Sequence, residues 1–402
     1  MGSGRQSRMT TNHGSQKYLS TRNVLSLIVL CAFTVLVTYQ WRHEAQFYHK
    51  FINVSLSSLT FAPPRPATLS RNQNATASTV VTTRTNLATF PPGNNATTTS
   101  PPPVFTTSQT VSSVCRNPFR EEYLRKQDYL CSRPLGRFGN MMFIYASSYG
   151  IATYNNRTLI MSKALMLTDY FNLNVLLVDD FECVVTGTKG VGPRQACAFD
   201  ESLMHIAIGE NVCLGSYLQS YKYFEHVQEA IKKQFTFKKE TRDKAMSIIN
   251  GAINTFHERN TTVKDTRPVL VGVHVRRGDM VKSKFGYAVA TPEYLGNATQ
   301  YYRDKFPNRL FIVCSNGMTW TKQHVVGDDV FYVEGNTFEV DMAVLVSCNH
   351  SLTTVGSFSW WAGFLAGGQV VYYQWPVMEK SGLRRHFSAN YTDYFPPSWI
   401  GM

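Results

Sequence analysis

The chain has 402 residues, of which 43% are hydrophobic and 17% are charged, and its formal net charge is +13. This composition is globular and allows two ordinary domains. Residues 1–23 and 42–114 together account for +8, which leaves only +5, scattered along the chain, for the residues after 114. Such a mild, dispersed charge excludes a nucleic-acid-binding surface but is compatible with an anionic ligand.

An apolar segment near the N-terminus predicts a membrane anchor. Residues 24–39 carry no charge, and the uncharged segment 24–41 reaches the length that a spanning helix needs. Residues 1–23 hold four basic side chains and no acidic one, which predicts a cytoplasmic N-terminus and a single-pass type II orientation. A cleaved signal peptide is the alternative, but the polar sequence after residue 39 is a poor cleavage site.

The segment after the anchor has the composition of a disordered luminal stem. Residues 42–114 are rich in Ser, Thr, Pro and Asn and hold few large apolar side chains. Eight glycosylation sequons support a luminal location, and they begin at Asn53, Asn74, Asn95, Asn156, Asn260, Asn297, Asn349 and Asn390. A short anchor suits the thinner membranes of the early secretory pathway, which comprises the endoplasmic reticulum and the Golgi. Seven cysteines follow the anchor without metal-ligand spacing, so we expect disulfides rather than zinc.

From residue 115 onward the pattern alternates strands and helices. We expect an N-terminal half over 115–260 and a C-terminal half over 261–402. The predicted strands are 128–133, 158–161, 269–275, 309–314, 330–333, 352–355 and, as the last, 370–373. The predicted helices are 141–153, 226–235, 239–259, 291–306, 339–348 and 357–365, and residues 163–220 are less regular. Strand–helix repetition of this kind predicts an α/β fold with two parallel, Rossmann-type halves facing a cleft.

The sequence His274-Val275-Arg276-Arg277-Gly278-Asp279 directly follows a buried strand. Ligands of doubly wound sheets bind at the carboxyl ends of strands. An arginine fork matches a diphosphate bidentately, so Arg276 and Arg277 are candidate diphosphate ligands. The simpler interpretation is a surface ion pair between arginine and Asp279. A third is an adhesion tripeptide, Arg-Gly-Asp, which would be poorly exposed beside a buried strand.

Two further strand ends in the C-terminal half carry polar residues. Ser315 and Asn316 offer hydrogen bonds to a ribose, base or sugar, although a plain turn explains them equally well. Ser357 opens a predicted helix whose backbone N–H groups would suit phosphate oxygens. Helix capping is the simpler role for Ser357. Phe358 lines either a base pocket or the core.

The N-terminal half contributes one glycine-rich element, Gly136-Arg137-Phe138-Gly139-Asn140. It joins a strand to a helix and would bring Arg137 and Asn140 towards the site from the opposite half. A tight turn with glycine at positive φ is the simpler interpretation. The chain has no Asp-X-Asp sequence, so a divalent metal has no obvious ligands and arginine would have to stabilise a leaving diphosphate.

These four elements together resemble the motifs of the galactoside α1,2-fucosyltransferases. The resemblance rests on 271–279, 311–320 and 354–368, with 136–140 as the N-terminal glycine element. It covers the chain from about residue 136 to its end, and His-X-Arg-Arg alone is shared with α1,6- and protein O-fucosyltransferases.

The resemblance implies a GT-B-like architecture, GDP-β-L-fucose as donor, a galactose-terminated glycan as acceptor, inversion at the anomeric carbon and no metal or other cofactor. It also implies roles for individual residues. The transfer also needs a stabilised leaving diphosphate and a base, so our catalytic candidates are Arg277 for the leaving group, Asp279 as base and His274 as the second choice of base. The donor-binding candidates are Arg276, Arg277, Ser315, Asn316, Ser357, Phe358, Arg137 and Asn140.

Two alternatives remain open at this point. The first is another fucosyl linkage, to protein or in α1,6 position. The second is a non-catalytic luminal lectin or adhesion glycoprotein, which would explain the anchor, stem and sequons but not four polar strand ends. The acceptor, its carrier and the oligomeric state do not follow from the sequence.

Overall fold

The computed structural model describes residues 129–186, 188–260 and 266–402. The predicted anchor and stem lie outside these residues, as do the sequons at Asn53, Asn74 and Asn95. Within the described ranges, no helix combines the length and apolarity needed to cross a bilayer.

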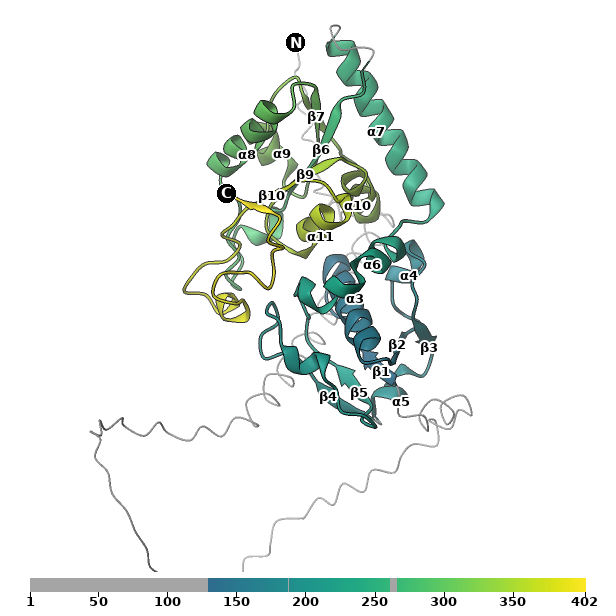
Figure 1. The fold of residues 1–402 in the computed structure, drawn as a ribbon. Helices are drawn as coiled ribbons and strands as arrows, with labels where there is room; N and C mark the ends of the chain where they lie inside the picture. Colours follow the sequence, from purple (N-terminus) through teal and green to yellow (C-terminus); the bar gives the residue numbers. More distant parts are fainter. Residues whose placement is uncertain (1–128, 187, 261–265) are drawn as a thin grey trace, which may run out of the picture. The chain divides into compact units, whose positions relative to one another are not determined.

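The first sheet is built from residues 129–214 and is entirely parallel (Figure 1). Its strand order is β3-β2-β1-β5-β4. The strands are β1 (Tyr129–Ser132), β2 (Thr158–Ser162), β3 (Leu176–Val178), β4 (Lys189–Val191) and β5 (Val212–Leu214). The helices of this region are α3 (Phe138–Tyr154), α4 (Leu167–Tyr170), α5 (Phe181–Thr186) and α6 (Gln228–Gln234), with 3₁₀ turns at η2 (Glu201–Met204), η3 (Tyr221–Tyr223) and η4 (Glu225–Val227). The next helix, α7 (Lys239–Arg259), packs instead against the half that contains the second sheet (Figure 1).

The second sheet is built from residues 269–401 and is also parallel, with the order β11-β10-β9-β6-β7-β8. Its strands are β6 (Val269–Val275), β7 (Arg309–Ser315), β8 (Val330–Tyr332), β9 (His350–Thr353), β10 (Val370–Tyr372) and β11 (Ile400–Gly401). Its helices are α8 (Pro292–Lys305), α9 (Met318–His324), α10 (Phe338–Val346) and α11 (Ser357–Ala366), with short turns at η6 (Gly278–Met280) and η7 (Leu383–His386). The expected α/β class with parallel sheets is confirmed.

Local sequence explains the best-defined elements. β6 pairs with β7 on one side and β9 on the other, and six of its seven residues are buried, as expected for a central parallel strand with both faces covered. α8 begins with Pro292 at its first position, and the Thr291 hydroxyl caps it by accepting a hydrogen bond from the backbone N–H of Tyr294.

Several boundaries differ from the prediction. α3 begins at Phe138 rather than residue 141, because the turn is confined to Gly136, whose φ is +75°, and the chain is helical directly after Arg137. β9 begins and ends two residues earlier than predicted. α9 and β11 were not predicted, so residues 370–373 do not form the last strand. β11 is only two residues long and depends on its pairing with β10.

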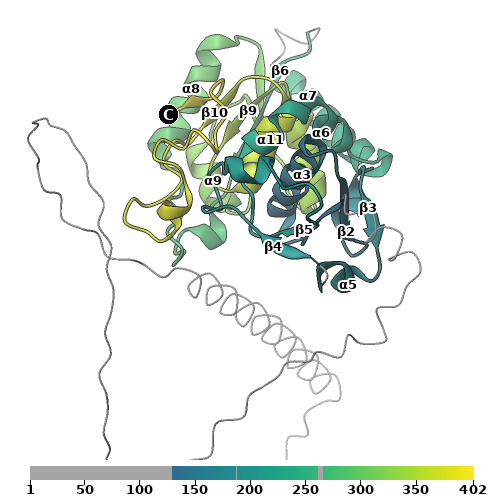
Figure 2. The ribbon, with the colours of Figure 1, turned by 60° about the horizontal axis from the view of Figure 1, so that its bottom comes forward.

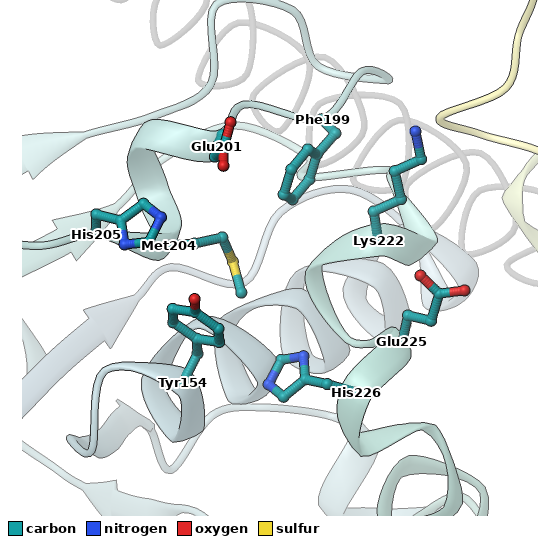
Figure 3. Close-up of a pocket in the computed structure, with 8 residues that line it drawn as sticks. All are labelled: Tyr154, Phe199, Glu201, Met204, His205, Lys222, Glu225 and His226. Carbon is teal, nitrogen blue, oxygen red and sulfur yellow. The ribbon is translucent and has the colours of Figure 1, made fainter.

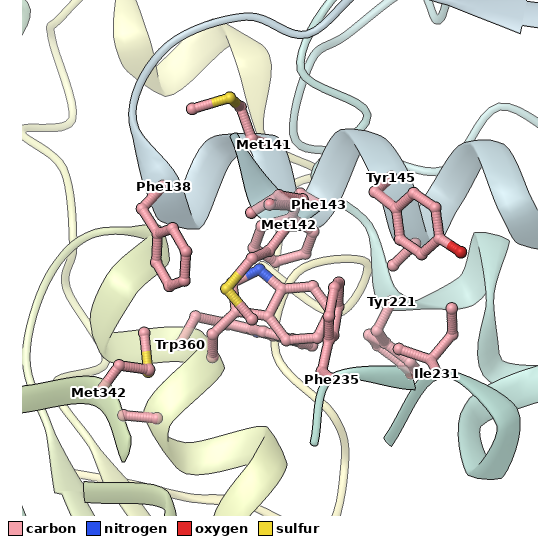
Figure 4. Packing of buried hydrophobic residues seen from close by; sticks show 14 of the residues in the cluster. Phe138, Met141, Met142, Phe143, Tyr145, Tyr221, Ile231, Phe235, Met342 and Trp360 are labelled. Carbon is pink, nitrogen blue, oxygen red and sulfur yellow. The ribbon is translucent and has the colours of Figure 1, made fainter. Parts of the chain in front are cut away.

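One of the hydrophobic clusters connects the two sheets. The ring of Phe143 on α3 lies 4.5 Å from that of Trp360 and 5.1 Å from that of Trp361, both on α11. Figure 4 shows side chains of α3 packed against Trp360 and against Met342 of α10. Seen from below, α3 and α11 lie side by side between the sheets (Figure 2). The α3–α11 contact therefore fixes how the strand ends of one sheet face those of the other.

Cysteine pairing, which the sequence left open, is partly defined. A disulfide joins Cys131 on β1 to Cys213 on the neighbouring strand β5. Cys183 is also disulfide-bonded. The thiols of Cys197, Cys314 and Cys348 are free and buried.

Candidate active site

The predicted strand-end residues come together on one edge of the second sheet. β6 lies between β7 and β9, so the segments that follow these three strands are neighbours. The segment after β1 reaches the same place from the other sheet, because α3 packs against α11. All four elements singled out by the sequence therefore belong to one site.

His274 lies at the end of β6 and is buried. Its Nδ1 lies 2.6 Å from the Ser359 hydroxyl oxygen, and that hydroxyl donates to the carbonyl of Val355. A hydroxyl has one proton to donate, so Ser359 accepts from Nδ1–H and the lone pair of the imidazole lies on Nε2. Burial, and then the positive charge of Arg276, lower the pKa of His274 to about 3. His274 is therefore a neutral imidazole at physiological pH.

Arg276 and Arg277 follow β6 and are held by their backbone as well as their side chains. The N–H of Arg276 donates to the hydroxyl of Thr354 (2.8 Å), which in turn donates to the carbonyl of His274 (3.0 Å). The N–H of Arg277 donates to Asn316 Oδ1 (2.8 Å). The guanidinium carbon of Arg277 lies 3.7 Å from the centre of the Trp320 ring. Stacking of this kind orients a guanidinium while leaving its edge free for a ligand.

The two arginines differ in their partners. Arg276 Nη2 lies 2.8 Å from a carboxylate oxygen of Asp279. Within the described part of the chain, the guanidinium of Arg277 makes no hydrogen bond or ion pair. Arg277 therefore keeps all its N–H donors available for an anion.

Asp279 links the two sheets. Besides Arg276, it accepts from Arg137 Nη1 (3.2 Å), which follows β1, and from Asn316 Nδ2 (3.2 Å), which follows β7. The ion-pair interpretation of the sequence is thus correct for Arg276, but three donors rather than one share this carboxylate. Three arginines against one carboxylate leave the site cationic.

Two helix N-termini meet beside these arginines. A Cβ atom added to Gly139, in the first turn of α3, would lie 2.7 Å from the backbone nitrogen of Phe358 in the first turn of α11. Neither helix has an acidic residue in its first turn or a side-chain cap. The first turns of the two helices are therefore in contact, and no acidic residue of either turn offsets the positive end of its helix, which favours an anion beside them.

The remaining predicted residues contact one another or the segments that hold the arginines. Asn140 Oδ1 accepts from the hydroxyl of Ser357 (2.5 Å) and from Gln219 Nε2 (2.9 Å). The ring of Phe358 lies 4.8 Å from that of His274. The hydroxyl of Ser315 is engaged within its own loop, where it contacts the Val275 carbonyl, the Thr321 hydroxyl and the Gly317 N–H.

Comparison with known proteins decides the family. Residues 110–402 match the sequence profile described as Glycosyl transferase family 11. The chain belongs to glycosyl transferase family 11. The predicted resemblance is confirmed, because curated relatives carry the same name as the family that the motifs suggested.

Two curated relatives show the degree of similarity. Galactoside alpha-(1,2)-fucosyltransferase 2 of Bos taurus is 31% identical over 283 residues, which cover 67% of this chain and 77% of that protein. The Sus scrofa protein of the same name is also 31% identical, over 67% of this chain and 78% of its own length. The match to a solved structure, the alpha-1,6-fucosyltransferase NodZ soaked with GDP-fucose, covers 63% of this chain and 97% of that one, at 13% identity and a TM-score of 0.38.

The sequence analysis missed several side chains of this family-11 enzyme. Trp320 and Thr354 lie within the motif blocks, but only the fold reveals that one stacks on Arg277 and the other connects β6 to the segment after β9. Asp341 on α10 has a buried carboxyl oxygen, Oδ1, that finds no hydrogen-bond partner among the residues the structure describes. Burial and then the neighbouring carboxylate of Glu339 raise the pKa of Asp341 to about 6. The sequence offered no signal for this residue beyond an acidic side chain in an apolar helix.

The described residues also show where the other predicted features lie. Asn156, Asn297, Asn349 and Asn390 are exposed, and Asn260 is partly exposed. No group of three or more His, Cys, Asp or Glu side chains in the described ranges is arranged to hold a metal ion.

Proposed function

We propose that this enzyme transfers L-fucose from GDP-β-L-fucose to the 2-hydroxyl of a terminal β-galactoside, with inversion, in a GT-B-like arrangement of its two halves and without a metal ion. The names of its relatives support the donor sugar, the acceptor and the linkage. We further propose that it acts in the Golgi lumen, anchored by residues 24–41, with its halves divided near residue 260.

The main support for this proposal comes from Arg277. Its guanidinium forms no hydrogen bond or ion pair within the described part of the chain, and it lies beside two helix N-termini. A sugar nucleotide leaves as a diphosphate, which gains negative charge as its bond to the sugar breaks. Positioned cations and backbone N–H groups that meet this charge lower the barrier most when they need no rearrangement. Stacking on Trp320 gives Arg277 that preorganisation.

The proposed transfer forms one bond, breaks one bond and moves one proton. The acceptor oxygen forms a bond to C1 of fucose from the face opposite the diphosphate. The bond between C1 and the phosphate oxygen breaks, and its electron pair leaves with GDP. The acceptor proton passes to a base. Arg276, Arg277 and the first turn of α11 would hold the diphosphate, with Ser357 and Asn140 positioned beside it.

Asp279 is our proposed base. Its carboxylate is paired with Arg276 and Arg137 in this structure, and such pairing lowers basicity. A bound diphosphate would compete for Arg276 and release one carboxylate oxygen for the acceptor hydroxyl. His274 is the weaker candidate, because its lowered pKa makes protonation unfavourable. We propose that its neutral Nε2 accepts a hydrogen bond from the donor nucleotide.

Asp279→Asn tests whether Asp279 is the base of the reaction. We expect turnover to fall about 10²- to 10⁴-fold, the usual contribution of a general base, with GDP affinity changed much less. The measurement is kcat with GDP-fucose together with equilibrium binding of GDP. Near-normal turnover in a folded variant would remove Asp279 from the mechanism.

The decisive experiment incubates the purified full-length enzyme with GDP-fucose, a panel of β-galactosides and EDTA, and determines the linkage of the product. An α1,2-fucosyl galactose formed in EDTA is the expected result. A different linkage would favour the protein O- or α1,6- alternative. GDP binding without transfer to any acceptor would point to an unidentified acceptor, and a folded protein that binds no GDP would favour a lectin.

A further inference from the structure

A pocket far from the arginines lies at the other end of α3. It has a volume of about 210 Å³ and is formed by the last turn of α3, by η2 together with Phe199 and His205, and by the segment from η3 to η4 (Figure 3). Asn140, at the site described above, is fourteen residues from Tyr154 at the pocket, which along a helix corresponds to about 21 Å. The pocket is therefore separate from the donor site.

Aromatic and apolar side chains form part of its lining. Tyr154 is 52% exposed, and the centre of its ring lies 5.7 Å from that of His205 and 5.6 Å from that of His226, edge-on to both. Figure 3 shows Met204 between Tyr154 and Phe199, with the charged and imidazole side chains of the lining around these three. Aromatic faces of this kind suit the C–H face of a sugar ring.

The polar groups of the lining are largely uncommitted. Glu201 and Glu225 supply carboxylates, and His205 and His226 supply imidazoles. Within the described part of the chain, none of these four side chains makes a hydrogen bond or ion pair. Their hydrogen-bonding capacity is therefore directed to solvent or to a ligand.

The lining is also held in place, which lowers the cost of binding. Lys222 Nζ lies 2.7 Å from Asp393 Oδ1, and the backbone N–H of Phe199 donates to the other oxygen of the same carboxylate (3.1 Å). Asn155 Oδ1, next to Tyr154, accepts from the N–H of Ile206 (2.9 Å), which fixes the loop after η2 against α3.

This combination points to a neutral, hydroxyl-rich ligand. A hydroxyl group both donates and accepts, so it matches a lining that mixes carboxylate acceptors with imidazole and ammonium groups. An ion would meet both signs of charge. The volume suits one sugar ring and is below the range typical of drug-sized ligands.

We propose that this pocket is a second carbohydrate subsite that binds one neutral hexose of a branched glycan while another branch occupies the site near Arg277. That this hexose belongs to the acceptor glycan rests on the proposed function. Binding two branches of one glycan raises its apparent affinity without a new contact at the catalytic site.

The same sugar chemistry has a second source on this chain. Asn156 is an exposed sequon two residues after Tyr154, so a glycan attached there would lie beside the pocket. Removal of this glycan distinguishes the two sources. If the enzyme's own glycan occupies the pocket, Asn156→Gln strengthens the binding of an added branched glycan. If the pocket is free, Asn156→Gln leaves that binding unchanged.

The test compares equilibrium binding of two neutral oligosaccharides, one with two galactose-terminated branches and one with a single branch, to the GDP-bound enzyme. We expect the wild type to bind the two-branched glycan on the order of tenfold more tightly. Tyr154→Ala and Glu225→Gln should each remove this advantage and leave single-branch binding unchanged. Two matched controls lie outside the pocket: Ile208→Ala at a fully exposed side chain and Glu258→Gln on α7 should keep it.

Two outcomes would overturn the subsite. The first is that neither the wild type nor Asn156→Gln binds the two-branched glycan more tightly than the single-branch glycan. The second is that Tyr154→Ala and Glu225→Gln both keep the preference for the two-branched glycan. Displacement of the pocket-dependent binding by an alkylammonium ion but not by free hexose would also overturn it. Fucose transfer to the single-branch glycan is measured separately. Its failure alongside pocket-dependent binding would reject the proposed function and retain the subsite.

Discussion

Arg277 is the residue on which the proposed chemistry depends most. Its guanidinium is stacked on Trp320 and has no anionic partner among the described residues. We expect Arg277→Ala to lower kcat about 10²- to 10³-fold, the loss usual when one donor to a developing negative charge is removed. Steady-state kinetics with GDP-fucose, with the variant expressed and folded as the wild type is, check this expectation.

Two further variants define what Arg277 contributes. Arg277→Lys keeps the charge but loses the planar fork and its stacking, so activity should remain close to that of Arg277→Ala. Arg259→Ala, at the exposed end of α7, is the matched control and should be fully active. Retained activity in Arg277→Ala would refute its role with the diphosphate.

Asp341 gives a residue-scale prediction about pH. Its carboxyl has a pKa of about 6 in the folded protein against 3.8 as the ordinary value. The folded state therefore holds a proton that the unfolded state has lost, and this group makes stability fall as pH rises from about 4 to 6. Asp341→Asn should raise Tm at pH 7.5 and leave it unchanged at pH 4.

The same substitution tests function. α10 lies behind β7, where the backbone carbonyl of Asp341 lies 3.9 Å from the thiol sulfur of Cys314. Because Oδ1 is buried away from solvent, we expect Asp341→Asn to stabilise the protein and to leave GDP affinity unchanged. Unchanged GDP affinity, measured by calorimetry, would confine Asp341 to a role in folding.

At the scale of elements, the contact between α3 and α11 positions the site. The added Cβ of Gly139→Ala would lie 2.7 Å from the Phe358 nitrogen and 2.8 Å from the Ser357 carbonyl carbon. Both are backbone atoms, so the helices must separate. We expect a loss of about 1–3 kcal/mol in the free energy of unfolding and a larger loss of activity.

A matched glycine provides the control. Gly251 lies within α7 and has no atom within 4 Å of an added Cβ. Gly251→Ala should therefore stabilise the enzyme by about 0.5–1 kcal/mol through helix propensity alone. Denaturant unfolding of both variants gives the two values, and equal behaviour would argue against the close approach at Gly139.

The sequence predicted the elements with strong local signals and missed those that depend on tertiary pairing. α7 and β6 have the predicted bounds, because one is a long amphipathic helix and the other a continuous β-branched strand. Three-residue strands such as β4 and β5 have too few residues for a periodic pattern, and β11 exists only through β10.

The same distinction applies to the site. The rule that ligands bind at strand ends singled out the arginines and Ser357, and the fold places the strands that precede them, β6 and β9, side by side. The contacts of Asp279 with Arg137 and of Trp320 with Arg277 join segments that are not adjacent in sequence. No local pattern encodes such an approach, so the partners of each charge became visible only in the fold.

At the scale of the whole described region, the two sheets should unfold together. The core around Phe143 contains residues from both sheets' helices, including Trp360 and Trp361. Neither sheet can lose its packing without exposing the other's aromatic side chains. Calorimetry of the full-length enzyme should therefore show one transition for this region, with equal calorimetric and van't Hoff enthalpies.

Phe143→Ala tests this coupling directly. Removal of a buried Phe side chain should lower the free energy of unfolding by about 3–5 kcal/mol, and the single transition should move to lower temperature as a unit. Phe285→Ala, at a side chain that is 72% exposed, should leave Tm unchanged. If Phe143→Ala instead splits the transition in two, the halves fold independently, and the geometry of the arginine site would be set by a movable contact rather than by a shared core.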